Sequence, residues 1–289
     1  MIHFVGLPLL IVLAVALLGG PTLDRLAPAV AASVNVVILL AVVLAAVPTF
    51  WVLGLSALSH AGVRHALSNW SMHLLPDQPI ASALIGVSSI VLAVGGLVRV
   101  AAVLRRHHRL RCAGGCAVEV VDTFEVFAYT LPGPAGTIAV SRGLRETLSD
   151  TEFDIVIAHE ESHARHRHDR FLLLALVVDA AVPFMRRATA QLRFHLERWA
   201  DEDAVRNTSA DRSTVARTIA KVALATTPNP AALGIATHGV AARASALMAP
   251  PTSAGATRLA LIAGIVTTTV ALSITQMHHT AVFTMHAIV

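Results

Sequence analysis

The most informative segment of the chain is His159-Glu160-Glu161-Ser162-His163, which has the pattern His-Glu-x-x-His. Ahead of it, Ser149-Asp150-Thr151-Glu152 has the spacing of a capping box, so the sequence predicts a helix that begins there and continues through His163. Side chains four positions apart lie on one face of a helix, which lets both imidazoles reach one metal ion. The carboxylate of Glu160 would lie close enough to take a proton from a water that zinc has made acidic. The motif therefore predicts one Zn²⁺ held by His159 and His163, with Glu160 as the catalytic base.

A second predicted helix, over residues 186–206, supplies a third metal ligand. It carries Glu197, and Asp201 lies four positions later on the same face. Glu197 would complete a set of two histidines and one glutamate with an open fourth position, which is typical of a catalytic zinc site. Asp201 would accept the remaining ring N–H of a ligating histidine and fix the orientation of that ring.

Plainer interpretations of both segments stay open at this point. The first helix could be a histidine-rich surface helix, because His166 and His168 follow the motif closely. Glu197 and Asp201 could belong to an acidic surface patch with the acidic residues that follow them. The presence of both helices in one chain favours the metal site over either alternative.

The composition is that of a membrane protein. Of the 289 residues, 55% are hydrophobic and 14% are charged, and the mean hydropathy is +0.67. This balance is too apolar for an ordinary soluble domain. Four apolar stretches approach the ~20 residues that a bilayer core requires, at residues 2–18, 30–58, 80–104 and 259–277. We therefore predict a mainly α integral-membrane protein with about four transmembrane helices.

The arginines predict the orientation in the membrane. Arg105, Arg106 and Arg109 follow the third apolar stretch, whereas the loop before that stretch holds only Arg64. Basic loops stay on the cytoplasmic side, so we expect residues 105–257 to form a cytoplasmic α+β metallopeptidase domain of the gluzincin type at the inner (plasma) membrane. The full division that we expect is three spans in residues 1–104, the domain at 105–257, and a fourth span with a short tail at 258–289.

One further apolar run, at residues 171–184, lies between the two metal-binding segments. A membrane span there would put Glu197 on the other side of the membrane from His159. The run is short and contains Asp179 and Pro183, so we interpret it as a buried or membrane-abutting helix. The other elements expected in this domain are two short strands and a helix, at residues 118–121, 137–140 and 213–225.

Several ordered motifs resemble the BlaR/MecR family of integral-membrane zinc metallopeptidases, in particular its short actinobacterial members without a penicillin-sensor domain. More distantly, the chain is similar to the HtpX-type quality-control peptidases. The resemblance implies a protein substrate, namely a cytoplasmic transcriptional repressor of the BlaI/MecI type that is cleaved in response to a signal. The motifs that carry the resemblance lie at residues 128–133, 138–144, 159–163, 197–201 and 242–247.

The same resemblance implies roles for residues outside the metal set. The strand that contains Ile138 and Val140 would be an edge strand facing the zinc, on which a substrate peptide adds as a further strand. Arg243 would steady the cleft or bind the substrate backbone, although a surface salt bridge is an equal alternative. His238 and Tyr129, the only tyrosine, are rival donors to the oxyanion of the transition state.

Three functions remain to be separated. Two are proteolytic: signal-dependent cleavage of a repressor, and quality control of membrane proteins as in the HtpX type. The third is a membrane metal sensor without proteolysis, suggested by the 15 histidines and the apolar stretches. Because those stretches contain almost no ionisable residue besides Arg99, no ion path is visible and the sensor is disfavoured. The basic pI, near 10.0, is explained by lipid-facing loops, so direct binding of nucleic acid is not expected.

Overall fold

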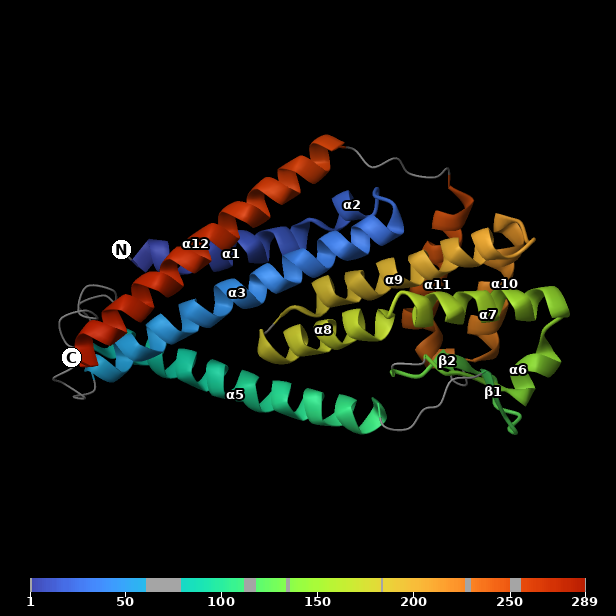
Figure 1. Cartoon of the computed structure of the whole chain (residues 1–289), viewed down its shortest axis with the longest axis horizontal. Helices are drawn as coiled ribbons and strands as arrows, with labels where there is room; N and C mark the ends of the chain where they lie inside the picture. Colours follow the sequence, from blue (N-terminus) through green and yellow to red (C-terminus); the bar gives the residue numbers. More distant parts are fainter. Residues whose placement is uncertain are drawn as a thin grey trace.

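The computed structural model of this chain describes residues 2–60, 79–111, 118–133, 136–182, 184–226, 230–249 and 256–288. Within these residues the chain is mainly helical and has one small mixed sheet. Long helices lie at one end of an elongated molecule, and the sheet and the shorter helices lie at the other (Figure 1). The elements in chain order are α1 (Ile2–Leu18), α2 (Gly20–Leu23), α3 (Pro28–His60), α5 (Pro79–Arg111), β1 (Val118–Val121), β2 (Ala128–Thr130), β3 (Ile138–Ser141), α6 (Arg142–Thr147), α7 (Asp150–Arg165), α8 (His168–Ala181), α9 (Arg186–Asn207), α10 (Arg212–Ala225), α11 (Pro230–Met248) and α12 (Ala256–Ile288).

The long helices pack around α3, which contacts α1, α5 and α12. Val12, Ile38 and Val42 are fully buried between these helices. The outward faces are apolar as well, since Trp51 is 59% and Leu97 70% exposed. A helix that is apolar on all sides is not suited to contact with water, so this bundle has the surface of a membrane-embedded element.

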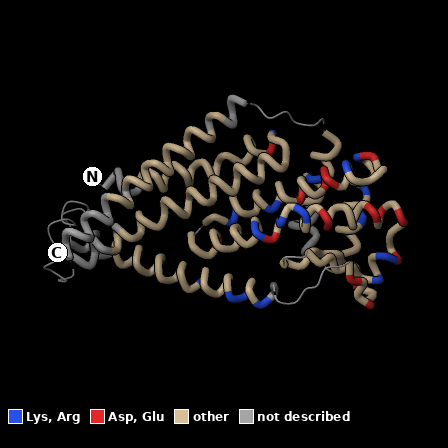
Figure 2. Tube along the Cα trace, viewed as in Figure 1, with Lys and Arg blue, Asp and Glu red and all other residues tan. Residues whose placement is uncertain are grey.

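Charged side chains divide the molecule into two halves. Figure 2 shows Lys, Arg, Asp and Glu gathered at the end that holds the sheet, while the far end of the helical bundle shows none in the part that the structure describes. Charged residues are expensive in hydrocarbon, so the charge-free half is the part that a bilayer would accommodate.

Two helices in the described part of the chain are long and apolar enough to cross a membrane, judged by length and composition: Pro28–Trp51 in α3 and Leu84–Arg109 in α5. The first and fourth apolar stretches contribute the shorter apolar segments Leu7–Leu18 and Ile262–Thr275. The structure therefore shows two candidate spans and not the four expected. The reason is that the described apolar parts of α1 and α12 fall short of the ~20 residues a span requires.

The sheet has the strand order β1-β3-β2, with β3 parallel to β1 and antiparallel to β2. The expectation that the strand containing Ile138 and Val140 is an edge strand is therefore wrong. Every residue of β3 is buried, because this strand is hydrogen-bonded on both sides and one of its faces packs beneath α7. The edge strand next to α7 is β2, which the sequence analysis did not predict.

The α8–α9 hairpin explains how the two metal-binding segments meet. α8 packs along α9 and also contacts α3 and α5. The chain reverses direction between α8 and α9, and α9 therefore lies against α7. Gly96 of α5 permits the close approach, since a Cβ there would lie 3.0 Å from the carbonyl oxygen of Ala181. The helix at residues 168–181 thus abuts a candidate span, in agreement with the sequence interpretation.

The turn that precedes α3 docks on α9. Arg198 donates a hydrogen bond to the backbone carbonyl of Asp24 at 3.0 Å. The ring of His195, which is fully buried, lies 3.7 Å from the Asp24 carboxylate. The N-terminal helices therefore touch the same helix that carries Glu197.

Candidate metal centre

α7 brings the two histidines of the motif together. Its N-terminus has the expected capping box, in which the Ser149 hydroxyl accepts from the backbone N–H of Glu152 and the Glu152 carboxylate accepts from that of Ser149. The helix then continues unbroken past His163. The Nε2 atoms of His159 and His163 are 3.2 Å apart, so both rings point at one place.

Glu197 completes this group from α9. Its carboxylate oxygens lie 3.5 Å from Nε2 of His159 and 3.6 Å from Nε2 of His163. The three donor atoms are all within 4.8 Å of one another. Two imidazole nitrogens and one carboxylate oxygen, converging on a single point, are a ligand set that fits one zinc ion with a position left open.

Asp201 and Arg243 lie directly behind the ligands. The Asp201 carboxylate is buried and lies 3.0 Å from Nδ1 of His159, on the side of the ring away from the site. Arg243, from α11, donates two hydrogen bonds to Asp201, at 2.8 and 2.6 Å. It also forms an ion pair with Glu197 at 2.8 Å. One guanidinium therefore links the third ligand to the carboxylate that contacts the first ligand.

His163 has a different partner. Its Nδ1 is 2.7 Å from Nδ1 of His168, so one ring donates to the other. His168 is buried, and it packs against Trp199 of α9 with ring centroids 5.0 Å apart. Its other nitrogen, Nε2, is buried and has no hydrogen-bond partner in the described structure.

Glu160 faces the sheet across the opening of the site. The hydroxyl of Thr130, on β2, lies 2.8 Å from the Glu160 carboxylate and 2.9 Å from the Glu160 backbone carbonyl, and can donate to either. The side chain is thus held between the metal-binding helix and β2, which among the described strands pairs only with β3. It lies one residue from a ligand and is almost completely buried.

Comparison with known families identifies this arrangement. A model of peptidase family M48 matches residues 99–228, a stretch that contains α7, α9 and the whole sheet. Residues 99–228 are an M48 peptidase domain. Comparisons with curated proteins and with solved structures gave no match. With the two histidines and Glu197 in place, the M48 domain is a zinc metalloendopeptidase whose substrates are peptides or proteins.

Electrostatics in the M48 domain keep the third ligand ionised. Burial opposes ionisation of Glu197, but contact with His159 and the charge of Arg243 outweigh it and lower the Glu197 pKa. Burial likewise opposes protonation of His159, yet Asp201 and Glu197 raise its pKa to about 10 in the protein without metal. Burial and the neighbouring His163 and His166 lower the pKa of His168 to about 3, so His168 is neutral.

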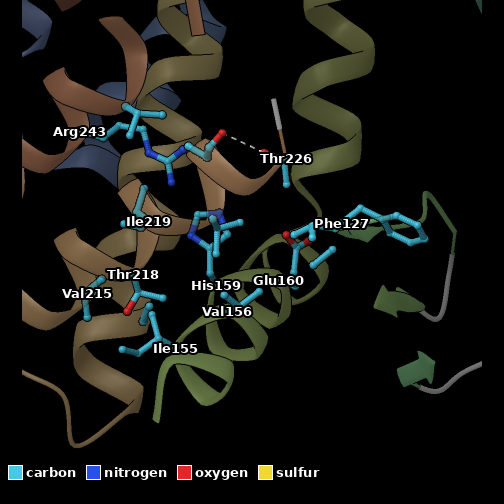
Figure 3. A pocket seen from close by; sticks show the side chains of 16 residues that line it. Phe127, Ile155, Val156, His159, Glu160, Val215, Thr218, Ile219, Thr226 and Arg243 are labelled. Atoms are coloured by element: carbon cyan, nitrogen blue, oxygen red, sulfur yellow. Dashed lines mark hydrogen bonds between the residues drawn. The ribbon is translucent and has the colours of Figure 1, made fainter. Parts of the chain in front are cut away.

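Two hollows adjoin the metal centre of the M48 domain, one on each side of Glu160. Both include His159, Glu160 and Ala128 in their linings. The first, about 450 Å³, lies among α7, α10 and α11 and is shown in Figure 3. The second, about 440 Å³, runs along residues 129–133 toward α8 and α5. Because both linings include His159, Glu160 and Ala128, both hollows border the metal centre beside β2, and we refer to the two together as the cleft.

The structure brings some of the remaining sequence-predicted residues to this cleft and not others. Arg243 lies in it, and Tyr129 lines the second hollow with 46% exposure. Ile138 and Val140 are buried in the middle of the sheet and line neither hollow. His238 falls within α11, but its side chain is outside the described part of the structure.

The sequence did not predict the hydrogen bond between Thr130 and Glu160, or the contacts of Arg243 with both Asp201 and Glu197. Thr130 lies within the 128–133 motif that carried the family resemblance, so its position was marked but not its role. No local pattern could have paired Arg243 with Asp201, because they come from different helices forty-two positions apart.

Proposed function

We propose that this chain is an integral-membrane zinc metalloendopeptidase in which Glu160 is the catalytic base, acting at the cytoplasmic face of the membrane. The observation that carries this proposal is the Glu160 carboxylate, which is buried beside the ligand His159 and held by Thr130 at the opening of the cleft. A general base must reach the proton of the attacking water, and a carboxylate that borders both hollows beside the ligand His159 is suited to this role.

Zinc bound by His159, His163 and Glu197 would supply a Lewis acid that polarises the scissile carbonyl and activates water. Glu160 would take the proton from the attacking water and pass it to the nitrogen of the leaving amine. The Thr130 hydroxyl would fix the rotamer of Glu160, so that its free oxygen faces the cleft.

Asp201 and Arg243 would act on the ligands and not on the substrate. Asp201 would hold the ring of His159 with Nε2 directed at the metal. Arg243 would fix Asp201 through two parallel hydrogen bonds and share the charge of Glu197. Of the two roles that the family resemblance implied for Arg243, these contacts support the one in which it steadies the cleft over direct binding of the substrate backbone.

The substrate backbone would pair with β2. This strand borders both hollows and is hydrogen-bonded only to β3 within the described residues. An extended peptide can add to such an edge through main-chain hydrogen bonds. Ile138 and Val140 would support this site from beneath, as the buried centre of the sheet. Tyr129, exposed on β2, stays a candidate donor to the oxyanion, as does His238.

The membrane placement follows from the charge-free half of the molecule. α3 and α5 would cross the bilayer, with α1 and α12 packed on α3. The arginines at the end of α5 would then lie on the cytoplasmic side, which puts the metal centre there as well.

For the substrate we carry two candidates. The family resemblance in the sequence supports a cytoplasmic repressor of the BlaI/MecI type, cleaved when a signal arrives. The second hollow supports a membrane-protein segment, as in HtpX-type quality control, because its lining includes Leu173 and Leu176 of α8 and His107, near the end of the candidate span in α5.

The proposal is tested by comparing wild type, Glu160→Gln and Glu161→Gln, purified in detergent. Glu161 is the matched control: it is adjacent in sequence, lies on the outer face of α7 and forms an ion pair with Arg165. We expect Glu160→Gln to bind one zinc per chain and to lose at least about 100-fold of the cleavage rate, since general-base catalysis is worth that much. Glu161→Gln should cleave like wild type.

Equal cleavage by Glu160→Gln would contradict its role as base. Bound zinc without cleavage in any of the three proteins would support the sensor function instead. Fragments that accumulate in cells with wild type and not with Glu160→Gln would identify the substrate. One dominant soluble fragment would support a repressor, and many membrane-protein fragments would support quality control.

A further inference from the structure

His168 lies behind the ligand His163, with Nδ1 of one ring 2.7 Å from Nδ1 of the other. The ring is 1% exposed, and its Nε2 is buried without a hydrogen-bond partner among the residues that the structure describes. It therefore cannot reach a substrate in the cleft. We propose that His168 is a positioning residue of the metal centre, whose Nδ1 accepts the ring N–H of His163 and so leaves Nε2 of His163 free for the metal. This inference rests on the ligand set of the proposed function.

The direction of this hydrogen bond follows from the chemistry of the ligand. Nε2 of His163 faces the other two ligands, 3.2 Å from Nε2 of His159 and 3.6 Å from the Glu197 carboxylate. A neutral imidazole that binds a metal through one nitrogen carries its proton on the other nitrogen. Nδ1 of His163 is therefore the donor and Nδ1 of His168 the acceptor. It follows that His168 carries its own proton on Nε2.

A break in the helix brings the two rings together. Residues five positions apart on a continuous helix point in directions about 140° apart, so their side chains do not meet. Here α7 ends at Arg165 and α8 begins at His168. Arg167, between them, has the left-handed backbone conformation, with a φ of 55°. After this break the centroids of the His163 and His168 rings are 4.8 Å apart.

The contact is kept at the cost of two unfavourable features. Arg167 has a backbone conformation that disfavours any residue with a Cβ atom. The Nε2–H of His168 is buried without an acceptor in the described part of the chain, which also costs free energy. An apolar side chain would avoid this second cost and could still pack against Phe171 and Trp199, whose rings surround His168. Packing alone therefore does not explain a histidine here, whereas an acceptor for His163 does.

Two substitutions separate the acceptor from the packing. His168→Leu keeps an apolar contact and removes the acceptor. His168→Asn keeps an acceptor, since the amide oxygen of Asn is attached to Cγ just as Nδ1 of histidine is. We expect His168→Leu to lose about 10- to 100-fold of the zinc affinity, the range found for partners of ligating histidines, and His168→Asn to stay close to wild type. Competition with a chromogenic chelator, on protein purified in detergent, measures the affinity without any peptide substrate.

His166→Leu is the matched control. The His166 ring belongs to the same aromatic cluster, with its centroid 5.9 Å from that of His168 and 4.4 Å from that of Trp199. Its Nε2 lies 2.9 Å from Asp203, which is not a ligand, so His166→Leu should bind zinc like wild type. Wild-type affinity in His168→Leu would overturn the proposal. Equal losses in His168→Leu and in either His168→Asn or His166→Leu would overturn it as well, because packing would then explain the effect.

A second measurement does not depend on the folding of any variant. When Co²⁺ replaces zinc, the ring N–H protons of ligating histidines give strongly shifted NMR signals that disappear as they exchange with heavy water. We expect two slowly exchanging signals in wild type, from His159 beside the buried Asp201 and from His163 beside the buried His168. A single slow signal would overturn the proposal, since Nδ1 of His163 would then lack a protected proton.

These outcomes are distinct from those that test proteolysis. If the zinc affinities and the two slow signals are as expected but no peptide is cleaved, the role of His168 stands and the proposed peptidase function fails. If peptides are cleaved and His168→Leu binds zinc like wild type, the peptidase function stands and the role of His168 fails. A protein that binds neither zinc nor Co²⁺ would overturn both.

Discussion

The two histidine ligands are oriented by different partners. Nδ1 of His159 lies 3.0 Å from the buried Asp201 carboxylate, whereas Nδ1 of His163 lies 2.7 Å from the neutral ring of His168. A carboxylate partner raises the basicity of a ligating imidazole more than a neutral one does. His159 should therefore be the stronger of the two nitrogen ligands.

Asp201→Asn should weaken zinc binding by about 10- to 100-fold, the range found when a partner of a metal-ligating histidine is removed. The change keeps the size of the side chain, but it removes the charge that His159 and Arg243 both contact. The measurement is the zinc dissociation constant by competition with a chromogenic chelator. Glu202→Gln is the control, because Glu202 pairs with Arg212 and not with the site. A wild-type zinc affinity in Asp201→Asn would refute the role of Asp201.

Thr130→Val should lower kcat by about 10- to 100-fold while the zinc content stays constant. The substitution keeps the shape of the side chain and removes the hydroxyl beside the Glu160 carboxylate. A hydrogen bond to a charged group contributes about 1.5–3 kcal/mol, and about 1.4 kcal/mol corresponds to tenfold in rate.

Thr147→Val is the control for Thr130→Val, since the Thr147 hydroxyl donates to a carbonyl of its own helix, away from the cleft. Steady-state kinetics would decide the matter. A change in KM alone would mean that Thr130 contacts substrate and does not orient the base.

At the scale of single residues, the metal set could be predicted because it follows local rules. His159 and His163 share a helix face by spacing, and Glu197 and Asp201 do so on a second helix. The contacts of Thr130 and Arg243 could not be predicted, because they depend on how β2 and α11 pack against those helices. Such contacts leave no periodic signal in the chain.

At the scale of elements, α7 and α9 are joined by a buried carboxylate below the metal centre. Asp203 accepts from the buried Ser162 hydroxyl at 2.7 Å, lies 2.9 Å from the His166 ring and pairs with Arg206. The pair of helices that supplies all three ligands is therefore also joined by side chains that are not ligands.

Asp203→Ala should destabilise the fold by about 1–3 kcal/mol, because it leaves the Ser162 hydroxyl buried without its acceptor. Denaturant unfolding in detergent would measure this loss. Ser162→Ala should lose less, and the double variant should lose less than the sum of the two, since both remove the same contact. Additive effects would mean that Asp203 acts through another partner. Asp154→Ala, an exposed site on α7, should be neutral.

The elements themselves were predictable to different degrees. α7 was expected because its cap, Ser149 with Glu152, is a local sequence pattern. β2 was not, because three residues cannot display the alternation that reveals a strand. Without β2, the sequence could not show that β3 is central, and the edge-strand role was given to Ile138 and Val140. The order of strands depends on pairings between distant segments, which hydropathy does not record.

At the scale of the whole molecule, the apolar composition predicted a membrane bundle but overstated the spans. Leu7–Leu18 and Ile262–Thr275 are the described apolar parts of α1 and α12, and both are shorter than the ~20 residues that a span requires. Both helices lie against α3. The docking of the Asp24 turn on α9 was equally invisible in the sequence, since it joins residues 174 positions apart.

The charge distribution leads to a prediction about orientation. If the metal centre lies in the cytoplasm, the basic residues of the described chain face that side, because the opposite end of the bundle shows none (Figure 2). Trypsin cuts after Lys and Arg, so protection from trypsin reports where these residues lie. In spheroplasts, where only the outer surface is accessible, we expect one cut at most, at Arg64 in the loop between the second and third apolar stretches. In inverted membrane vesicles, we expect extensive cutting of residues 105–257.

The control for this prediction is Arg64→Gln. It should remove the single cut in spheroplasts and leave the pattern in inverted vesicles unchanged. The reverse pattern, with residues 105–257 cut in spheroplasts, would place the peptidase domain outside the cell and exclude a cytoplasmic substrate.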